Sequence, residues 1–190
     1  MTERERLTVA RILKVNHAGE YGAIRIYRGQ IWVARRRCPE AVSFLEETLG
    51  HEIKHCALFL SAMPARAARP CRIMGLWGNG GLLLGFLTAL LGRQGIWICT
   101  AAVEAAVHRH MAEQLLFLRG RDRELFSIIA DIQDEELMHL RHARERIVTA
   151  TTSARLLDAF IGWATDVAIW LSTWGDSTRM ARELAAARRG

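Results

Sequence analysis

Two Glu-x-x-His motifs, Glu52-x-x-His55 and Glu136-x-x-His139, constrain this chain more than any other feature. Each lies in a segment with helical periodicity, where residues three apart share one face of the helix. A single such motif is weak support for a site, because a helix-rich chain with 20 acidic residues and 7 histidines is expected to contain one by chance. A solvated helix face is the ordinary alternative. The spacing of the two motifs therefore decides between a site and a chance match.

Both motifs belong to a repeat. The second motif follows the first by 84 residues, and Glu104 follows Glu20 by the same number. Within each half, the single glutamate precedes its motif by 32 residues. This pattern is typical of di-metal four-helix bundles, in which two helices each supply one glutamate and two others each supply Glu-x-x-His. The predicted metal ligands are Glu20, Glu52, His55, Glu104, Glu136 and His139.

The chemistry of this ligand set favours particular metals. Carboxylates and imidazoles are oxygen and nitrogen donors, which suit iron or manganese better than they suit a cysteine-rich zinc site. Four ionised glutamates would balance the charge of two divalent cations, and this balance would allow the cluster to be buried. The cysteines form no Cys-x-x-Cys pair and indicate a reducing compartment; they are Cys38, Cys56, Cys71 and Cys99.

The interval of 84 residues also sorts the remaining histidines. It pairs His17 with Ala101 and His51 with Glu135, so neither histidine has a ligand as its counterpart. The same holds for His108, His110 and His142. We therefore predict that these five histidines lie outside the ligand set. Glu135 is the best candidate to orient a ligand imidazole across the cluster, with a surface carboxylate as the alternative.

The composition predicts an all-α fold in one domain. Good to moderate helix formers dominate the chain of 190 residues, which contains only three prolines. We expect a ferritin-like four-helix bundle built from two similar helix pairs, plus one or two additional C-terminal helices. The expected helices cover residues 7–36, a segment between Pro39 and Pro64, residues 73–118 with an exposed or membrane-touching beginning, residues 122 to about Thr149 with Asp122 as cap, and residues 154–174 with Thr152 or Ser153 as cap. The domain core should span about residues 7–174, and residues 175–190 should form a charged, solvated tail.

The segment from Ile73 to Leu91 is uncharged and rich in leucine and glycine. Its length matches the roughly 18 apolar residues of a membrane span. A span is disfavoured, because the helix that follows carries Glu104, which must meet the other ligands in a bundle core. We predict instead that the segment docks on a membrane surface, helped by the net charge of +6. Packing in the core or in a dimer is the alternative for this segment and for Trp163, Trp170 and Trp174.

Residues His17 to Gln30 read HAGEYGAIRIYRGQ. This stretch resembles the signature H-A-G-E-Y-G-A-x-R-I-Y-x-G-Q of the demethoxyubiquinone hydroxylases. The likeness continues through both Glu-x-x-His motifs, Cys99-Thr100, Asp134-Glu135 and the segment Val167–Ser172, and it covers about residues 10–174. By resemblance, the residues that match the iron ligands of the family are the same six that the repeat selects. Two positions depart from the pattern: His110-Met111 replaces a His-Tyr pair of some members, and His51 stands where Gln or Glu is expected.

The resemblance implies a function. Family members insert one oxygen atom of O₂ into a ring C–H bond of a demethoxylated, polyprenylated quinone, while the other atom leaves as water. Such a reaction implies two iron ions per chain, two electrons from a reductase or reduced nicotinamide, and contact with the membrane that holds the quinone. It implies a peripheral location on the cytoplasmic face of a bacterial inner membrane or the matrix side of the mitochondrial one. Other ubiquinone-biosynthesis proteins and a second copy of the chain are compatible partners, and no nucleic acid is expected.

Other functions fit parts of the sequence. A ferroxidase or iron-storage protein would share the ligand cluster without needing a large apolar surface. A rubrerythrin-like peroxidase would add a four-cysteine iron module, which these cysteines do not match. A tRNA-modifying di-iron hydroxylase would explain the basic charge, and its RNA binding would depend steeply on salt. A non-catalytic quinone- or lipid-binding scaffold would bind membranes without iron. Only the quinone hydroxylase accounts for both the cluster and the motif.

Overall fold

The computed structural model of the protein describes residues 1–148 and 151–189, and these residues form an all-α fold. Two short 3₁₀ helices, Pro39–Ala41 and Pro64–Arg66, flank the second long helix, and the described residues contain no strand. The α-helices are α1 (Glu3–Arg37), α2 (Val42–Ala62), α3 (Met74–Leu90), α4 (Arg93–Leu118), α5 (Arg123–Glu145), α6 (Thr152–Ser172) and α7 (Asp176–Ala187).

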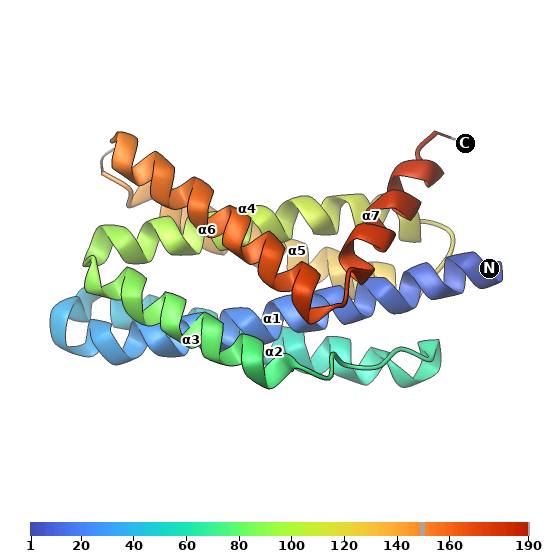
Figure 1. The fold of residues 1–190 in the computed structure, drawn as a ribbon, viewed down its shortest axis with the longest axis horizontal. Helices are drawn as coiled ribbons and strands as arrows, with labels where there is room; N and C mark the ends of the chain where they lie inside the picture. Colours follow the sequence, from blue (N-terminus) through green and yellow to red (C-terminus); the bar gives the residue numbers. More distant parts are fainter. Residues whose placement is uncertain (149–150, 190) are drawn as a thin grey trace.

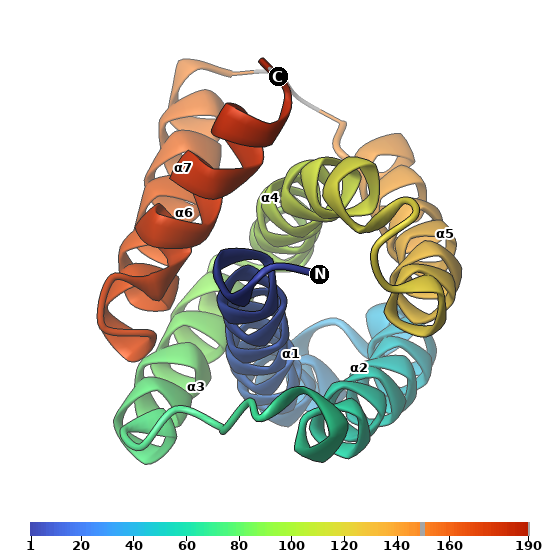
Figure 2. The ribbon, with the colours of Figure 1, turned by 90° about the vertical axis from the view of Figure 1, so that its right-hand side faces the viewer.

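The predicted four-helix bundle consists of α1, α2, α4 and α5. Figure 2 shows these four helices end-on, arranged around a common centre. The helices α3, α6 and α7 form an outer layer on the side of α1 and α4, and α6 crosses the bundle obliquely in Figure 1. Helix α1 packs on α2 and α3, as α4 packs on α5 and α6. Each half therefore contains three helices in the same arrangement, and α3 in the first half corresponds to α6 in the second.

Side-chain caps explain the starts of three helices, α1, α5 and α6. The Thr2 side chain accepts a hydrogen bond from the Glu5 N–H and thereby starts α1 before the predicted Leu7. Asp122 caps α5 as predicted, through the Leu125 N–H. For α6 the prediction was wrong by one or two residues: Thr151 is the cap, because its hydroxyl accepts from the Ala154 N–H. Helix α5 ends at Glu145, and the predicted end, Thr149, lies outside the described residues.

The prediction of one helix over residues 73–118 was wrong. The glycines of α3 do not break it, and the chain turns instead at Gly92, which has a φ of 80°. The glycines allow α3 to approach α1 closely. A Cβ at Gly85 would lie 2.0 Å from the Ile26 carbonyl oxygen, and one at Gly81 would lie 2.9 Å from that of Gly22. Close backbone packing therefore explains Gly81 and Gly85 of α3.

The prediction of a solvated tail over residues 175–190 was also wrong. Residues Asp176–Ala187 form α7, which packs against α1. Met180 and Leu184 are buried in that contact. The Asp176 carboxylate accepts a hydrogen bond from Lys14 Nζ at 2.6 Å, which ties the start of α7 to α1. The charged residues occupy the outer face of an amphipathic helix, so charge content alone misled the prediction.

Two apolar clusters fill the bundle on either side of its middle. One includes Ile12, Phe59 and Leu125, and the other includes Leu45 and Leu140. The predicted ligands lie on the same helices between these clusters. Within the described part of the chain, no helix combines the length and the apolar character that crossing a membrane requires.

Candidate metal centre

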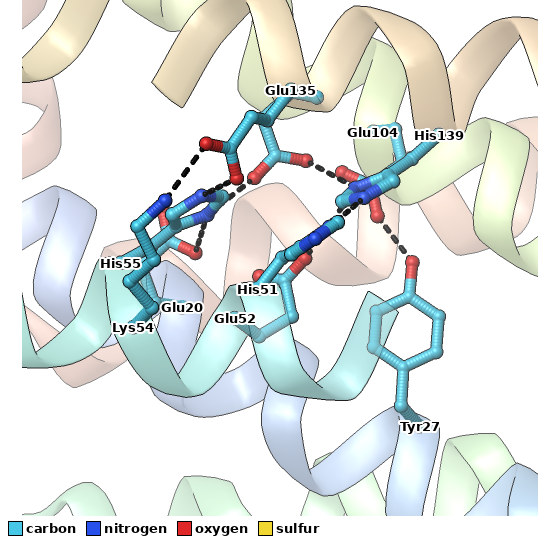
Figure 3. A network of polar contacts seen from close by, with 10 residues as sticks. Glu20, Tyr27, His51, Glu52, Lys54, His55, Glu104, Glu135 and His139 are labelled. Carbon is cyan, nitrogen blue, oxygen red and sulfur yellow. Dashed lines mark hydrogen bonds and ion pairs between the residues drawn. The ribbon is translucent and has the colours of Figure 1, made fainter. Parts of the chain in front are cut away.

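The six predicted ligands come together inside the bundle. Helix α1 supplies Glu20, α2 supplies Glu52 and His55, and α4 and α5 supply the other three (Figure 3). All six side chains are buried, with at most 5% of any of these residues exposed. They form two overlapping groups whose potential ligand atoms lie within 4.8 Å of one another. We call Glu20, Glu52, His55 and Glu136 site one, and Glu52, Glu104, Glu136 and His139 site two.

The two sites share Glu52 and Glu136. Each site also has one carboxylate and one imidazole of its own, which is the symmetry that the repeat predicts. A carboxylate has two oxygen atoms, so each shared glutamate can offer one oxygen to either site. The arrangement is suited to two neighbouring cations bridged by carboxylates.

Unpaired polar atoms test whether a cation fits. Glu52 Oε1, His55 Nδ1 and Glu136 Oε1 are buried and have no hydrogen-bond partner among the described residues. His55 Nδ1 lies 3.0 Å from Glu136 Oε1 without the geometry of a hydrogen bond. Leaving such atoms unpaired costs about 1–3 kcal/mol each. All three are ligand-type atoms of the two sites, so the residues present fit a bound metal pair.

Burial makes these carboxyl groups unusual. Loss of solvent raises the pKa of Glu20, Glu52 and Glu104, and repulsion from Glu136 adds to this shift. Burial also opposes ionisation of Glu136, but its polar contacts with Glu104, His139 and His55 outweigh it and lower the pKa of that carboxyl. A divalent cation reverses this balance, because it favours the ionised form of every carboxylate around it. The cluster is therefore electrostatically incomplete without cations.

Side chains outside the ligand set hold both imidazoles. Glu135 Oε2 lies 3.0 Å from His55 Nε2, and Lys54 Nζ donates to Glu135 Oε1 at 2.9 Å (Figure 3). Burial works against ionisation of Glu135, but the hydrogen bonds from Lys54 and His55 prevail and lower its pKa. On the other side, His51 Nδ1 lies 2.9 Å from His139 Nε2. The structure thus places Glu135 as the sequence predicts and adds His51 as its equivalent.

Tyr27 is the contact that sequence reasoning missed. Its hydroxyl donates a short hydrogen bond to Glu104, and the ring is fully buried (Figure 3). Burial and the neighbouring Glu104 charge hold the pKa of Tyr27 well above its usual value, so the phenol remains a donor. A sequence signal existed, because Tyr27 follows Glu20 by two helical turns and therefore lies on the same face of α1.

The remaining histidines belong to neither group of potential ligand atoms. His17 is buried and its Nδ1 has no partner among the described residues. His142 stacks on Phe44, with ring centroids 3.9 Å apart. His110 Nε2 lies 3.4 Å from Asp166 on α6, and His108 likewise belongs to neither ligand group.

An apolar cavity of about 340 Å³ lies between α1, α3, α4 and α6. It borders residues next to the ligands, namely Gly19 beside Glu20 and Val103 beside Glu104. Its lining is almost wholly apolar; it comprises Ala18, Gly19, Gly22, Ala23, Ile26, Trp77, Gly80, Gly81, Leu83, Leu84, Leu87, Val103, Val107, Phe160, Ala164, Thr165, Ala168, Ile169 and Ser172. The outer layer therefore borders a space suited to an apolar ligand, and two chain neighbours of predicted ligands line it.

A family model described as "Ubiquinone biosynthesis protein COQ7" matches residues 7–172. The chain belongs to the COQ7 family. Among its relatives, a mouse protein named NADPH-dependent 3-demethoxyubiquinone 3-hydroxylase, mitochondrial, is 37% identical over 88% of this chain and 78% of its own length. A 3-demethoxyubiquinol 3-hydroxylase of Rhodospirillum rubrum is 35% identical over 86% of this chain and 77% of its own length. A Saccharomyces cerevisiae protein named 5-demethoxyubiquinone hydroxylase, mitochondrial, is 31% identical over 84% of this chain and 75% of its own length. The family match confirms the resemblance seen in the sequence.

Proposed function

We propose that this protein is a di-iron monooxygenase that hydroxylates the ring of a demethoxylated, polyprenylated quinone in ubiquinone biosynthesis. The single observation that supports it best is the combination, in a chain of the COQ7 family, of a buried cluster of four glutamates and two histidines with an apolar cavity lined by chain neighbours of that cluster. A ferroxidase needs the cluster and has no use for the cavity. The relatives are named as hydroxylases of the same class of quinone.

The proposed cofactor is two iron ions per chain. Glu20 and His55 would hold one ion and Glu104 and His139 the other, with the two shared glutamates contacting both. When bound, the iron pair would supply the redox chemistry that activates O₂. The electrons would come from a reductase or from reduced nicotinamide, and the name of the mouse relative favours NADPH as their source.

The protein's own residues would orient the substrate and exclude water. The cavity has the volume of a small-ligand pocket and few polar atoms, so the apolar quinone ring would displace only weakly held solvent. Gly19 and Gly22 line it where α1 passes the cluster, so no side chain separates the ring from the α1 backbone there. Phe160 and Leu87 are half exposed and also line the cavity, which suits a path for the isoprenoid tail.

The quinone's tail requires a lipid surface, so we propose peripheral attachment to a membrane through α3 and α6. The location would be the matrix side of the mitochondrial inner membrane or the cytoplasmic face of a bacterial one. The relatives include both mitochondrial proteins and a bacterial one.

Two measurements test the function. Deleting the gene should cause a quinone precursor that lacks one methoxy group to accumulate, detected by mass spectrometry of extracted lipids. Purified, iron-loaded protein given a reductant, a short-tailed demethoxyquinone and ¹⁸O₂ should yield a product that carries one labelled oxygen. Catalytic Fe²⁺ oxidation with no quinone product would instead establish a ferroxidase.

A cavity variant links the reaction to the proposed substrate site. Ala168 lines the cavity from α6, and Ala159 lies exposed on the same helix outside it. We expect Ala168→Phe to lower quinone turnover at least tenfold while iron content stays unchanged. Ala159→Phe is the matched control and should retain normal turnover. Equal activity of the two variants would remove the cavity from the proposal.

A further inference from the structure

Both ligand histidines turn the same nitrogen toward the cluster. His55 Nδ1 lies 3.0 Å from Glu136 Oε1, and His139 Nδ1 lies 3.4 Å from Glu136 Oε2. Each Nε2 points away and contacts a side chain outside the ligand set (Figure 3). A neutral imidazole that binds a cation through Nδ1 carries its proton on Nε2, so the outer nitrogen is a hydrogen-bond donor. The outer partners are therefore acceptors.

These acceptors occupy equivalent positions of the repeat and differ in chemistry. Glu135 follows His51 by 84 residues, and each immediately precedes the glutamate of its Glu-x-x-His motif. Each reaches across to the histidine of the other half, at 3.0 Å for Glu135 and 2.9 Å for His51. Site one thus has a carboxylate behind its imidazole, and site two has a second imidazole. A carboxylate acceptor increases the basicity of a ligand histidine more than a neutral acceptor does.

The single carboxylates show a second, independent difference. Glu104 of site two accepts a hydrogen bond from Tyr27, which withdraws negative charge from that ligand. The repeat places Met111 at the position that corresponds to Tyr27, and a buried thioether cannot donate a hydrogen bond. Glu20 of site one therefore has no equivalent phenol. Both differences leave site two with the weaker donors.

We infer that the two sites are inequivalent, that the first metal ion binds at site one, and that His51 is the positioning residue that sets the weaker affinity of site two. This inference rests on the proposed metal centre and is independent of the quinone chemistry. It assigns a consequence to His51, which stands where the family pattern leads one to expect Gln or Glu. His51 can still accept a hydrogen bond from His139. It does not carry the negative charge that Glu135 places beside His55 in site one.

The test is a titration of the metal-free, full-length protein with Co²⁺, followed by calorimetry and by the visible absorption of the bound ion. The wild type should bind two equivalents in two resolved steps. The ligand variants Glu20→Ala and Glu104→Ala assign the steps: the first should abolish the tight step and the second the weak one. Loss of the weak step in Glu20→Ala, with the tight step intact, would overturn the assignment.

The outer acceptors are then varied. We expect His51→Ala to weaken the second step about 10–100-fold and to leave the first unchanged, whereas Glu135→Ala should weaken the first. His51→Gln should restore the second step, because its amide oxygen can accept, and His51→Glu should bring the two affinities closer. Circular dichroism confirms that each variant is folded. The rescue by Gln and the step-specific change are effects that loss of packing alone would not give.

The outcomes separate this inference from the proposed function. Failure of the wild type to bind Co²⁺ or Fe²⁺ would overturn the metal centre itself. The wild type could instead bind two equivalents while His51→Ala and Glu135→Ala change both steps equally. That result would overturn only the inequivalence of the two sites. A His51→Gln variant that stays as weak as His51→Ala would overturn the role of His51 as an acceptor.

Discussion

His17 is close in sequence to a predicted ligand but belongs to neither ligand group. It lies one helical turn before Glu20 on α1 and is buried, yet it belongs to neither site. Burial lowers the pKa of its imidazole, so it stays neutral at physiological pH. Its position inside the bundle suits packing beside the ligands.

We expect His17→Ala to retain both metal ions and His55→Ala and His139→Ala each to lose at least one. A removed ligand costs more than a lost supporting contact, which already lowers metal affinity about 10–100-fold. Metal content of anaerobically prepared protein, measured by plasma emission spectrometry, is the readout. A folded but metal-free His17→Ala protein would show that the repeat gives the wrong ligand set.

The repeat explains which residues of the site were predictable. The six predicted ligands and Glu135 recur at fixed intervals, and a fixed interval on equivalent helices places side chains at equivalent depths. Tyr27 has no polar counterpart, since Met111 stands at the related position, so the repeat could not reveal it. For His51 the interval gave its pairing with Glu135 but left its contact with His139 unforeseen.

Helix α3 is held against α1 by backbone proximity, which makes its glycines sensitive to substitution. We expect Gly85→Ala to destabilise the protein by about 1–3 kcal/mol or more, because the new methyl group must displace one helix from the other. Gly80, on the same helix, has no atom within 4 Å of a built Cβ, so Gly80→Ala should stabilise the protein by up to about 1 kcal/mol. Thermal unfolding of both variants gives the comparison. Equal destabilisation would contradict the close contact at Gly85.

The start of α5 combines a helix cap with an ion pair. Asp122 caps the helix and receives two hydrogen bonds from Arg66, at 2.6 and 2.8 Å, with both side chains about 10% exposed. Asp122→Asn should keep the cap, since Asn is an equally good capping residue. It should lower the free energy of unfolding by about 1–3 kcal/mol, because the charged contact with Arg66 is lost. Asp122→Ala should lose the cap as well, which should lower the free energy of unfolding by about 1 kcal/mol more.

The same pair gives a pH dependence. The hydrogen bonds from Arg66 lower the pKa of Asp122, so its unfolded value, about 3.9, lies above the folded one. The stabilisation is therefore fully present above about pH 4 and is lost as the pH falls through the folded pKa. In urea unfolding, the free energy of unfolding of the wild type should exceed that of Asp122→Asn at pH 6. The difference between the two proteins should shrink in more acidic solution. A gap that widens on acidification would contradict this sign.

Helix existence followed from periodicity, but the role of α3 and α7 did not. A glycine-rich run reads as interrupted because glycine is a poor helix former, and only the neighbouring helix explains its presence. A short charged segment reads as a solvated end because its buried residues are few, as Met180 and Leu184 are in α7. Both elements depend on packing against α1, which is a tertiary contact that local sequence does not specify.

The whole molecule has a two-layer plan in which the outer layer performs tasks that the bundle cannot. Helices α3 and α6 lie outside the bundle (Figures 1 and 2). The bundle contains the predicted ligands, while α3 and α6 line the cavity and carry large exposed apolar side chains. These side chains are Leu82, Leu83, Leu87, Leu90, Leu156, Phe160, Trp163 and Trp170. Large exposed apolar side chains on neighbouring helices are typical of membrane or protein interfaces when they form one patch. Because Leu83, Leu87 and Phe160 also line the cavity, docking there would bring the cavity to the lipid.

At this scale, we expect the protein to bind vesicles peripherally through α3. Exposed Arg69 and Arg72 precede the helix, and each basic residue near an anionic surface contributes about 1 kcal/mol. Leu82→Glu combined with Leu83→Glu should release the protein from anionic vesicles in high salt, with helicity and metal content unchanged. Leu60→Glu combined with Leu116→Glu is the matched control, since these leucines are similarly exposed on α2 and α4. Sedimentation with vesicles measures binding. Wild-type protein that resists alkaline carbonate and leaves membranes only in detergent would show that α3 anchors the chain integrally.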